Sequence, residues 1–598
     1  MTEALTDRRG SEIGRRQLLG ASLTGAGIAL AAAGIGGGPA RQASAAILTS
    51  VPKRWDAQAD LVSLGASCGG LMGAIRGHDF GMKTMLLEVG NVIGGGTAVS
   101  NGGMWIPLTS MQKEAGYPDS KEIVIDYIRS TSFGRHDEEK LAAYLDNGAE
   151  AVAYANAQTS CKIVGSIGGD YFTQDSNSRP GRAVWPDLEN GARIMANPQR
   201  YPLFAKVRKP YIPMSVGGQK GVTAELGGGN ALIGSLVASC TDRNIPILMN
   251  TRAMRLITEN GRVIGVHALK DGKDFYVRAN RAVLIAVGGF EHNQDMHRMF
   301  SPINAHVYSG VPPTNVGDGH IMGMEVGAAI GLMDLGVWMA ALQMPGEQYP
   351  GIPWQQDGST IVFYPGQIVV NRDGKRFCDE SFYPAVPKGF MVPPTDKESQ
   401  FPNWPAFVIM DQAVRDKFEF GDAPKGTEMR KWLYRADTLR ELAGQIGVNP
   451  DGLEQTVKQF NADSARGVDS LFGRGSDNLN PIVLAAREKA RRATAGATVA
   501  PYYVEGFKMG TLQKPPFYAA KLGIGTEGTR GGLITNPQCQ VIDVRGDVIP
   551  GLYATSNAAA QLAVGGSYTS GMSIGQSFVF GYLAAKHVAG KDKQASAG

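Results

Sequence analysis

The stretch DLVSLGASCGG, residues 60–70, decides the fold that this sequence predicts. Residues 60–64 are apolar enough for a short buried strand, a glycine turn follows, and an apolar helix continues to about residue 76. Residues 83–89 are predicted as a second strand. A strand, a glycine turn, a helix and another strand, in this order, open a parallel nucleotide-binding sheet.

The glycine turn matches the G-x-G-x-x-G fingerprint of dinucleotide-binding sites, except that Ser67 stands at the second glycine. Gly65 permits the tight turn, and Gly70 lets the helix pack closely on the strand. The N-terminus of the helix offers N–H groups and a positive dipole end to a pyrophosphate. Glu88 ends the second strand, where an acid accepts from a ribose hydroxyl. We therefore predict that a dinucleotide binds at Gly65, Ser67, Gly69, Gly70 and Glu88.

FAD is favoured over NAD by the residues that follow the second predicted strand. Residues 94–103 read GGGTAVSNGG, and such small residues can pass a backbone alongside a flavin ring. The apolar residues 104–107 end this run, which indicates an ordered segment. The predicted FAD contacts in the run are Gly95, Gly96, Thr97, Ser100, Gly102 and Gly103, and those elsewhere are Ala253, Gly288, Asn557, Ser573 and Ile574.

The order of predicted elements indicates an α/β protein with a Rossmann-like FAD-binding domain formed from both ends of the mature chain. Residues 56–330 form the first part of this domain, and residues 505–598, with a closing helix at 573–589, form the second. Residues 331–504 have fewer glycine turns and more aromatic residues, which predicts an inserted α+β catalytic or substrate domain.

Residues 1–45 are predicted to be a twin-arginine signal peptide. Arg15 and Arg16 precede a weakly apolar stretch, and residues 43–45 (Ala-Ser-Ala) form a plausible cleavage site. The alternative is a short membrane anchor, but the stretch is short and rich in glycine and alanine. We expect export in the folded state to the periplasm or cell surface, and peripheral membrane association stays open.

Composition narrows the classes of partner. A net charge of +4 over 598 residues, without a basic block, disfavours nucleic acid. The five cysteines include no C-x-x-C pair, which disfavours a zinc site, a dithiol centre and covalent haem, so no metal is predicted.

Residues 95–107 resemble the G-G-S-T-A-x-S-G-G-x-I-W-x-P stretch of the 3-ketosteroid delta-1-dehydrogenases. These enzymes belong to a larger flavoprotein group that includes soluble fumarate reductases. The resemblance spans essentially all of the mature chain, through residues 314–319, 376–381, 472–475, 516–519, 528–533 and 551–557. It implies an FAD-dependent dehydrogenase that desaturates a ring next to a ketone and passes electrons to an external acceptor.

The resemblance also implies catalytic residues. The reaction removes a hydride from one ring carbon and a proton from the neighbour alpha to the ketone, so the carbonyl must be polarised and a base placed over the ring. Tyrosine can serve both needs. Tyr171 resembles the proton relay or acid, Tyr383 the base, and Tyr568 with Gly571 the pair that hydrogen-bonds the ketone. The chain departs from the family pattern at Pro384, which follows the base tyrosine instead of preceding it.

Three alternatives remain open. The same chemistry could act on a smaller ring, such as a cyclohexanone or an oxocyclohexane carboxylate. A fumarate- or urocanate-type reductase is disfavoured, because it needs arginine and histidine, and residues 381–414 and 556–574 contain no arginine. A flavoprotein that only carries electrons would be supported by haem or iron–sulfur ligand spacing, which the cysteines do not provide, and the set of family tyrosines argues against it.

Overall fold

The computed structural model describes residues 51–166, 168, 170–209, 225–301, 305–349, 352–357, 364–382, 385–394, 400–418, 420, 430–474, 481–483, 485, 509–562 and 571–591. For residues 343–349 and 352–357 only the backbone is described. The predicted signal peptide, Tyr383, Pro384 and Tyr568 lie outside the described residues.

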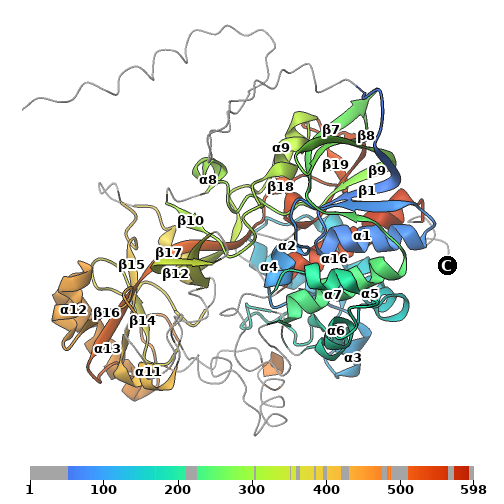
Figure 1. Cartoon of the computed structure of the whole chain (residues 1–598). Helices are drawn as coiled ribbons and strands as arrows, with labels where there is room; N and C mark the ends of the chain where they lie inside the picture. The colour runs from blue at the N-terminus through green and yellow to red at the C-terminus, as the bar shows by residue number, and fades with distance from the viewer. Residues whose placement is uncertain are drawn as a thin grey trace, which may run out of the picture. The chain divides into compact units, whose positions relative to one another are not determined.

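An eight-stranded sheet contains strands from both ends of the chain (Figure 1). Five neighbouring strands of this sheet are parallel, in the order β20-β9-β1-β2-β6. They are β1 (Ala57–Leu64), β2 (Thr84–Leu87), β6 (Ile247–Leu248), β9 (Lys273–Ile285) and β20 (Val548–Ala554). The antiparallel strands are β7 (Thr251–Glu259), β8 (Arg262–Lys270) and β19 (Gln540–Ile542). Parallel strands need both faces covered, and β2 is accordingly buried along its whole length.

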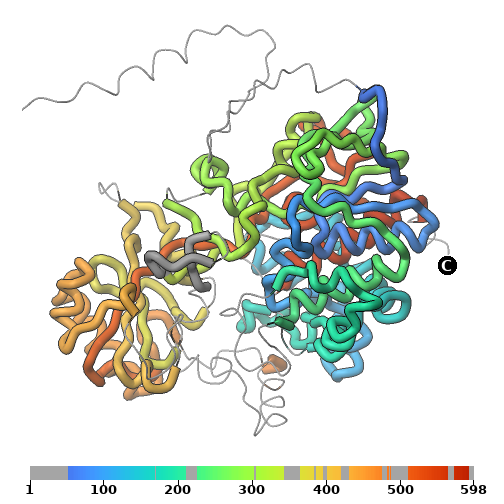
Figure 2. Tube along the Cα trace, in the orientation of Figure 1, coloured from blue at the N-terminus to red at the C-terminus, as the bar shows by residue number. Residues whose placement is uncertain are grey.

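Helices from both ends of the chain cover one face of this sheet. They are α1 (Cys68–Asp79), α5 (Glu138–Gln158), α7 (Gly228–Asp242) and α16 (Met572–Val588). In Figure 2 the blue tube of α1 and the red tube of α16 run side by side. The two helices can approach closely because Gly69 has no side chain. A Cβ there would lie only 2.7 Å from the hydroxyl of Ser577. The sequence predicted Gly69 as a cofactor contact, and the structure gives it a packing role at this crossing.

Further elements lie outside the two large sheets and the four covering helices. They are α2 (Gly95–Val99), β3 (Met104–Trp105), α3 (Ser110–Glu114), α4 (Lys121–Ser132), β4 (Ile163–Gly165), β5 (Ala183–Pro186), α6 (Leu188–Met195), η2 (Pro202–Lys206), α8 (Gln294–Phe300), α9 (Asp318–Glu325), β11 (Ile330–Gly331), β18 (Gly532–Leu533) and η5 (Ser556–Ala558).

A second, seven-stranded sheet is built around β17 (Phe517–Thr529). Its order is β13-β12-β17-β15-β14, from β12 (Gly336–Tyr349), β13 (Ile352–Asp357), β14 (Ile368–Val370) and β15 (Ala406–Asp411), and β17 also pairs with β10 (Val307–Tyr308) and β16 (Tyr434–Ala436). The helices that follow these strands are α10 (Ala385–Phe390), α11 (Gln412–Lys417), α12 (Leu439–Ile446) and α13 (Pro450–Arg466). Two hydrophobic cores enclose this sheet, one of them closed by α12 and α13.

The predicted fold class, an α/β FAD-binding fold, is confirmed. The helix predicted at 573–589 is α16. The strands β7 and β8 form an antiparallel hairpin around Asn260. The predicted domain boundaries stay predictions. The strand β17 belongs to the seven-stranded sheet, although its residues fall within 505–598, the range predicted for the second part of the FAD-binding domain. Among the described residues no helix is long and apolar enough to cross a membrane.

Candidate active site

The turn between β1 and α1 is built so that only glycine fits at both of its ends. Gly65 has φ +94°, and a Cβ there would lie 2.5 Å from the carbonyl oxygen of Ala286. A Cβ on Gly70 would overlap the carbonyl oxygen of Gly65. Ser67 is the N-cap of α1, and its side chain makes no capping hydrogen bond. The Ser67 side chain therefore does not occupy the amides of the first turn, which the start of an α-helix leaves without intrahelical partners and which a phosphate can use.

Glu88 stands beside this turn, where the sequence placed it. The side chain is buried, its Oε2 accepts from the amide of Ala66 at 2.9 Å, and its Oε1 accepts from the amide of Gly90 at 3.0 Å. Burial raises the pKa of the Glu88 carboxyl, and the two donating amides oppose that rise. Each oxygen keeps a second lone pair, so the carboxylate can still accept from a ribose hydroxyl.

The second glycine run packs against the first. A Cβ on Gly95 would lie 3.2 Å from the Cβ of Ser67, so the run passes directly over the phosphate turn. Ser100 holds the run in shape, because its Oγ donates to the carbonyl of Thr97 at 2.7 Å and accepts from the amide of Gly102 at 3.0 Å. Gly96 is part of the short helix α2 in the same run.

The sequence prediction missed a third glycine run at residues 227–229. A Cβ on Gly229 would overlap the carbonyl oxygen of Thr97, and a Cβ on Gly102 would overlap the backbone of Gly228. These glycines open α7, and the amide of Gly227 donates to the side chain of Asn230 at 2.8 Å. Three consecutive glycines before an apolar helix were a visible signal of a close backbone approach.

Gly571 joins the glycine run to the last helix. It is the N-cap of α16 with φ +83°, and a Cβ there would overlap the carbonyl oxygen of Gly103. The carbonyl of Gly571 accepts from the amide of Trp105 at 3.1 Å. A predicted cofactor residue and the predicted ketone-binding residue are therefore in direct contact.

A buried amide network stands behind this contact. The Nε2 of Gln561 donates to Asn557 Oδ1 and to Ser573 Oγ, each at 2.9 Å. The Nε of Arg530 donates to Gln561 Oε1 at 2.9 Å. The network thus orders two predicted cofactor residues through Gln561 and Arg530, which the sequence prediction did not single out.

Glu291 is a second residue that the sequence prediction missed. It is fully buried, and its Oε1 accepts from the amide of Thr529 at 2.8 Å and from Asn557 Nδ2 at 3.4 Å. Its Oε2 is buried and has no hydrogen-bond partner among the described residues. A buried carboxylate oxygen needs a donor. The N–H and O–H groups of a flavin nucleotide would supply one, so the residues present fit FAD.

The remaining predicted cofactor residues lie at separate places. Gly288 follows β9, and a Cβ there would lie 2.7 Å from Asn315 Nδ2. Ala253 is buried in β7, opposite Ala268. Ile574 lies in the first turn of α16 and packs against the largest hydrophobic core.

The structure brings together the neighbours of two predicted catalytic tyrosines. Tyr171 is half-buried in the segment between β4 and β5. The ring of Phe172 meets the ring of Phe382 edge to face, with centroids 5.2 Å apart. Tyr383 directly follows Phe382 in the chain, so the two segments that carry these tyrosines are in contact.

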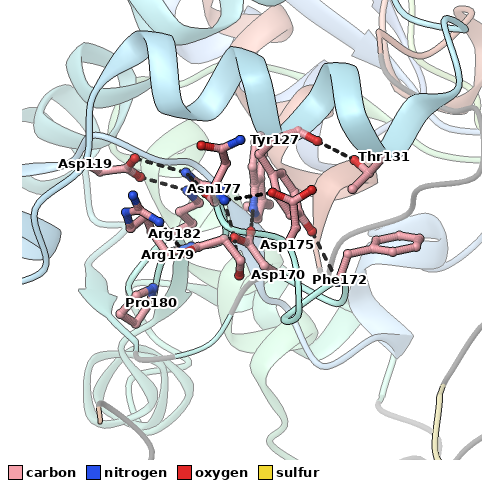
Figure 3. A network of polar contacts seen from close by, with 12 residues as sticks. Asp119, Tyr127, Thr131, Asp170, Phe172, Asp175, Asn177, Arg179, Pro180 and Arg182 are labelled. Carbon is pink, nitrogen blue, oxygen red and sulfur yellow. Dashed lines mark hydrogen bonds and ion pairs between the residues drawn. The ribbon is translucent and has the colours of Figure 1, made fainter. Parts of the chain in front are cut away.

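The segment that carries Tyr171 is held by buried charges (Figure 3). Arg182 pairs with Asp119 at 2.8 Å and with Asp170 at 2.9 Å, and all three side chains are almost fully buried. Burial raises the pKa of the Asp170 carboxyl, and the charge of Arg182 opposes the rise.

A second cluster of buried charges precedes the segment of Tyr383. Arg376 pairs with Glu380 at 2.7 Å and with Asp469 at 2.9 Å, and Arg474 pairs with Glu380 at 3.3 Å. Burial acts to raise the pKa of Asp469, but the hydrogen bonds and charge of Arg376 leave it below its usual value.

The five cysteines are all buried and unpaired, as residues of the core. Burial raises the pKa of each thiol, to about 12 for Cys161, Cys240 and Cys539 and well above its usual value for Cys68 and Cys378. Such thiols are unreactive at neutral pH.

The chain has relatives over nearly its whole length. The sequence pattern of the FAD binding domain family matches residues 60–574. The chain is 31% identical to the 3-oxosteroid 1-dehydrogenase of Mycobacterium tuberculosis, over 89% of this chain and 98% of that enzyme. It is 30% identical to the 4-oxocyclohexanecarboxylate 2-dehydrogenase of Sinomonas cyclohexanicum, over 89% and 93%.

A solved structure shows the same similarity in three dimensions. The 3-ketosteroid delta1-dehydrogenase from Sterolibacterium denitrificans, in complex with 1,4-androstadiene-3,17-dione, matches with a TM-score of 0.77 at 27% sequence identity. The match covers 89% of this chain and 99% of that chain.

Proposed function

The chain belongs to the FAD binding domain family and, within it, to the family of the 3-oxosteroid 1-dehydrogenases, and from this premise we propose that it desaturates the ring of a 3-ketosteroid next to the ketone. It is an FAD-dependent oxidoreductase. The steroid substrate is the part of the proposal that the relatives' activities suggest and that experiment must test.

The observation that carries the proposal is the contact of Gly571 with the glycine run. Gly571 caps α16, so its amide is not needed by the helix and can donate to a ketone oxygen. The N-terminus of a helix carries about half a positive charge, which would stabilise the negative charge that develops on that oxygen during enolisation. A Cβ on Gly571 would overlap Gly103, so Gly571 lies beside the predicted flavin-binding residues, and this supports its assignment as the donor.

The roles of the other residues follow from this arrangement. The turn at Gly65–Gly70, with Glu88, would hold the nucleotide part of FAD, which supplies the hydride acceptor when bound. Tyr383 would take the alpha proton, Tyr171 would assist its transfer, and Tyr568 would donate to the ketone with Gly571. Residues 556–562 and 571–574 contain no arginine, and the adjoining Arg530 donates to Gln561, which disfavours a fumarate-type reductase that binds a dicarboxylate with free forked cations in these segments.

The test is anaerobic reduction of the protein-bound flavin. A 3-ketosteroid should bleach the flavin absorbance, and the product should lack two hydrogen atoms by mass spectrometry, with ring-position analysis distinguishing 1,2- from 4,5-desaturation. Bleaching only by a small ring ketone would replace the steroid in the proposal. Reoxidation of chemically reduced enzyme by fumarate would support a reductase, and no response to any of them would support an electron carrier.

The smaller ring ketone is a second candidate substrate. It is favoured by the relative that acts on 4-oxocyclohexanecarboxylate, whose identity of 30% nearly equals the 31% of the steroid enzyme. Comparing kcat/KM for the two substrate classes decides between them.

We also propose export by the twin-arginine route to the periplasm or cell surface. The support is the Arg15-Arg16 pair with its apolar stretch and cleavage site. At that location oxygen, a quinone or a soluble carrier could reoxidise the flavin, and peripheral membrane association would favour the quinone. Fractionation of cells that produce the wild type and an Arg15→Lys/Arg16→Lys variant tests this: only the wild type should leave the cytoplasm.

A further inference from the structure

We propose that Trp105, Asp170 and Arg182 form a buried positioning unit that fixes the segment of Tyr171 relative to Gly571. The inference rests on the proposed function, because it takes Tyr171 and Gly571 to lie on two sides of the site that binds the ring ketone. None of the three residues was predicted to contact cofactor or substrate, and each would act through its neighbours.

Asp170 is the centre of the unit, because four donors meet on its carboxylate. Its Oδ1 accepts from Trp105 Nε1 at 2.9 Å. Its Oδ2 accepts from Ser178 Oγ at 3.1 Å, from the amide of Arg179 at 3.0 Å and from Arg182 Nη1 at 2.9 Å. The carboxylate therefore ties both ends of the segment 170–179 to each other and to β3.

Arg182 anchors this centre to the rest of the fold. Its guanidinium makes two hydrogen bonds to Asp119, at 2.8 and 3.0 Å, and one to the carbonyl of Asn177 at 2.9 Å. It also lies 5.1 Å from the centroid of the Tyr127 ring. Figure 3 shows these groups converging beneath the helix that carries Tyr127. If Arg182 moved away from Asp119 or Asp170, a buried charge would lose its partner, which is costly. The three side chains therefore favour a single arrangement.

Tyr171 is held from both sides by this arrangement. The preceding residue is Asp170, and the following residue, Phe172, donates its amide to Tyr127 Oη at 3.3 Å. The described residues between β4 and β5 contain no helix or strand, so side chains supply the anchors that a ladder would otherwise provide.

Trp105 connects the unit to Gly571 through a single residue. Its indole nitrogen donates to Asp170, and its backbone amide donates to the carbonyl of Gly571 at 3.1 Å. The indole is fully buried and stacks on Tyr144, with ring centroids 6.4 Å apart. A displacement of Asp170 is therefore transmitted to Gly571 through a rigid ring.

The experiment uses the FAD-loaded full chain and three variants. Trp105→Phe keeps an aromatic ring in the core but removes the indole N–H together with its five-membered ring, and it leaves no buried charge unpaired, so it should fold where Asp170→Asn fails to. Asp175→Asn is the control in the same segment, because it changes a carboxylate that accepts from Ser130 Oγ and from the amide of Asn177.

Kinetics on the best ring ketone separate positioning from stability. Trp105→Phe and Asp170→Asn should lower kcat by about 10- to 100-fold with KM nearly unchanged, as a misplaced proton-transfer group does. The deuterium isotope effect at the alpha carbon should rise, while a loss of folded enzyme lowers only the active fraction. Asp175→Asn should keep wild-type kcat. Wild-type kcat and isotope effects in flavin-loaded Trp105→Phe would overturn the proposal.

Amide hydrogen exchange tests the same unit without turnover. In Trp105→Phe, protection should fall together in segments 170–182 and 571–577. In Asp175→Asn any loss should stay within residues 173–177, because the bonds of Asp170 and Phe172 that flank Tyr171 remain. If no ketone reduces the wild-type flavin, the proposed function fails, yet the coupled loss of protection would still support the unit. Loss in only one segment would overturn the unit whatever the substrate.

Discussion

The ends of the two sheets hold their loops by different means. At the eight-stranded sheet, backbone packs on backbone through glycines, as at Gly70 on Gly65 and at Gly571 on Gly103. Beside the seven-stranded sheet, residues 364–382 and 469–474 are joined by the buried charges of Arg376, Glu380 and their partners. A backbone that must come close to a ligand leaves no room for side chains. A loop that needs only to be fixed in place can use them.

The largest effect is expected where backbone packs on backbone. Gly70→Ala would force a Cβ into the carbonyl oxygen of Gly65, and overpacking of about 3 kcal/mol corresponds to a roughly 100-fold loss of FAD affinity if the turn must open. Flavin absorbance per protein measures this. Gly444→Ala is the control, because nothing lies within 4 Å of a Cβ there. Normal FAD content in Gly70→Ala would show that the turn accommodates a Cβ at little cost in free energy.

The second effect concerns the buried charges. Arg376→Met leaves Glu380 and Asp469 without their shared cation, which should cost about 3–5 kcal/mol of unfolding free energy. FAD content should stay normal, because the glycine turn is untouched. Urea unfolding measures the loss, with the exposed Arg440→Met as control. A variant that loses FAD as readily as stability would show that the two regions are not separable.

A smaller effect is expected at Glu291, the carboxylate beside the glycine contacts. Glu291→Gln keeps the shape of the side chain but replaces one carboxylate oxygen, an acceptor, with an NH2 group, a donor. If that oxygen accepts from FAD, the change should weaken FAD binding by about tenfold. Titration of the apoprotein with FAD, followed by fluorescence quenching, measures the dissociation constant. An unchanged constant would assign the Oε2 atom to the substrate or to the fold.

The smallest effect is a difference in the response to acid. The pKa of Asp469 is lowered by Arg376, so its stabilising contribution is present at neutral pH and lost as pH falls. The pKa of Asp170 is raised by burial, so its protonation on acidification favours the folded state. As pH falls below about 4, amide exchange should therefore increase in 469–474 before it does in 170–182. Asp469→Asn should abolish this order.

The sequence predicted the parts of the site that depend on local chain geometry. The turn at Gly65–Gly70, the acid Glu88 and the closing helix after Gly571 all lie where their motifs placed them, because turns, caps and helices are specified by neighbouring residues.

Apart from the glycine run at 227–229, which carried a local signal, the missed parts of the site depend on contacts between distant segments. Three contacts show this: Thr529 donates to Glu291, Trp105 donates to Asp170, and Arg530 donates to Gln561. The two residues of each pair are far apart in the chain, so no local sequence pattern predicts the contact. The sheet membership of β17 was missed for the same reason, since its partners are chosen by pairing and not by its own residues.

The place of β17 has a consequence for synthesis of the chain. This strand occupies the middle of its sheet and pairs with β10, β12, β15 and β16, all made earlier. Its last residue, Thr529, hydrogen-bonds Phe290 and Glu291. A ribosome-bound chain that has not reached residue 517 therefore cannot close either the second sheet or the Glu291 site, and strand pairings across such distances form slowly. The strands β12 and β13 can pair earlier, as can β14 and β15, but these two pairs lack the strand that joins them. We therefore expect the chain to depend on chaperones until β17 has emerged.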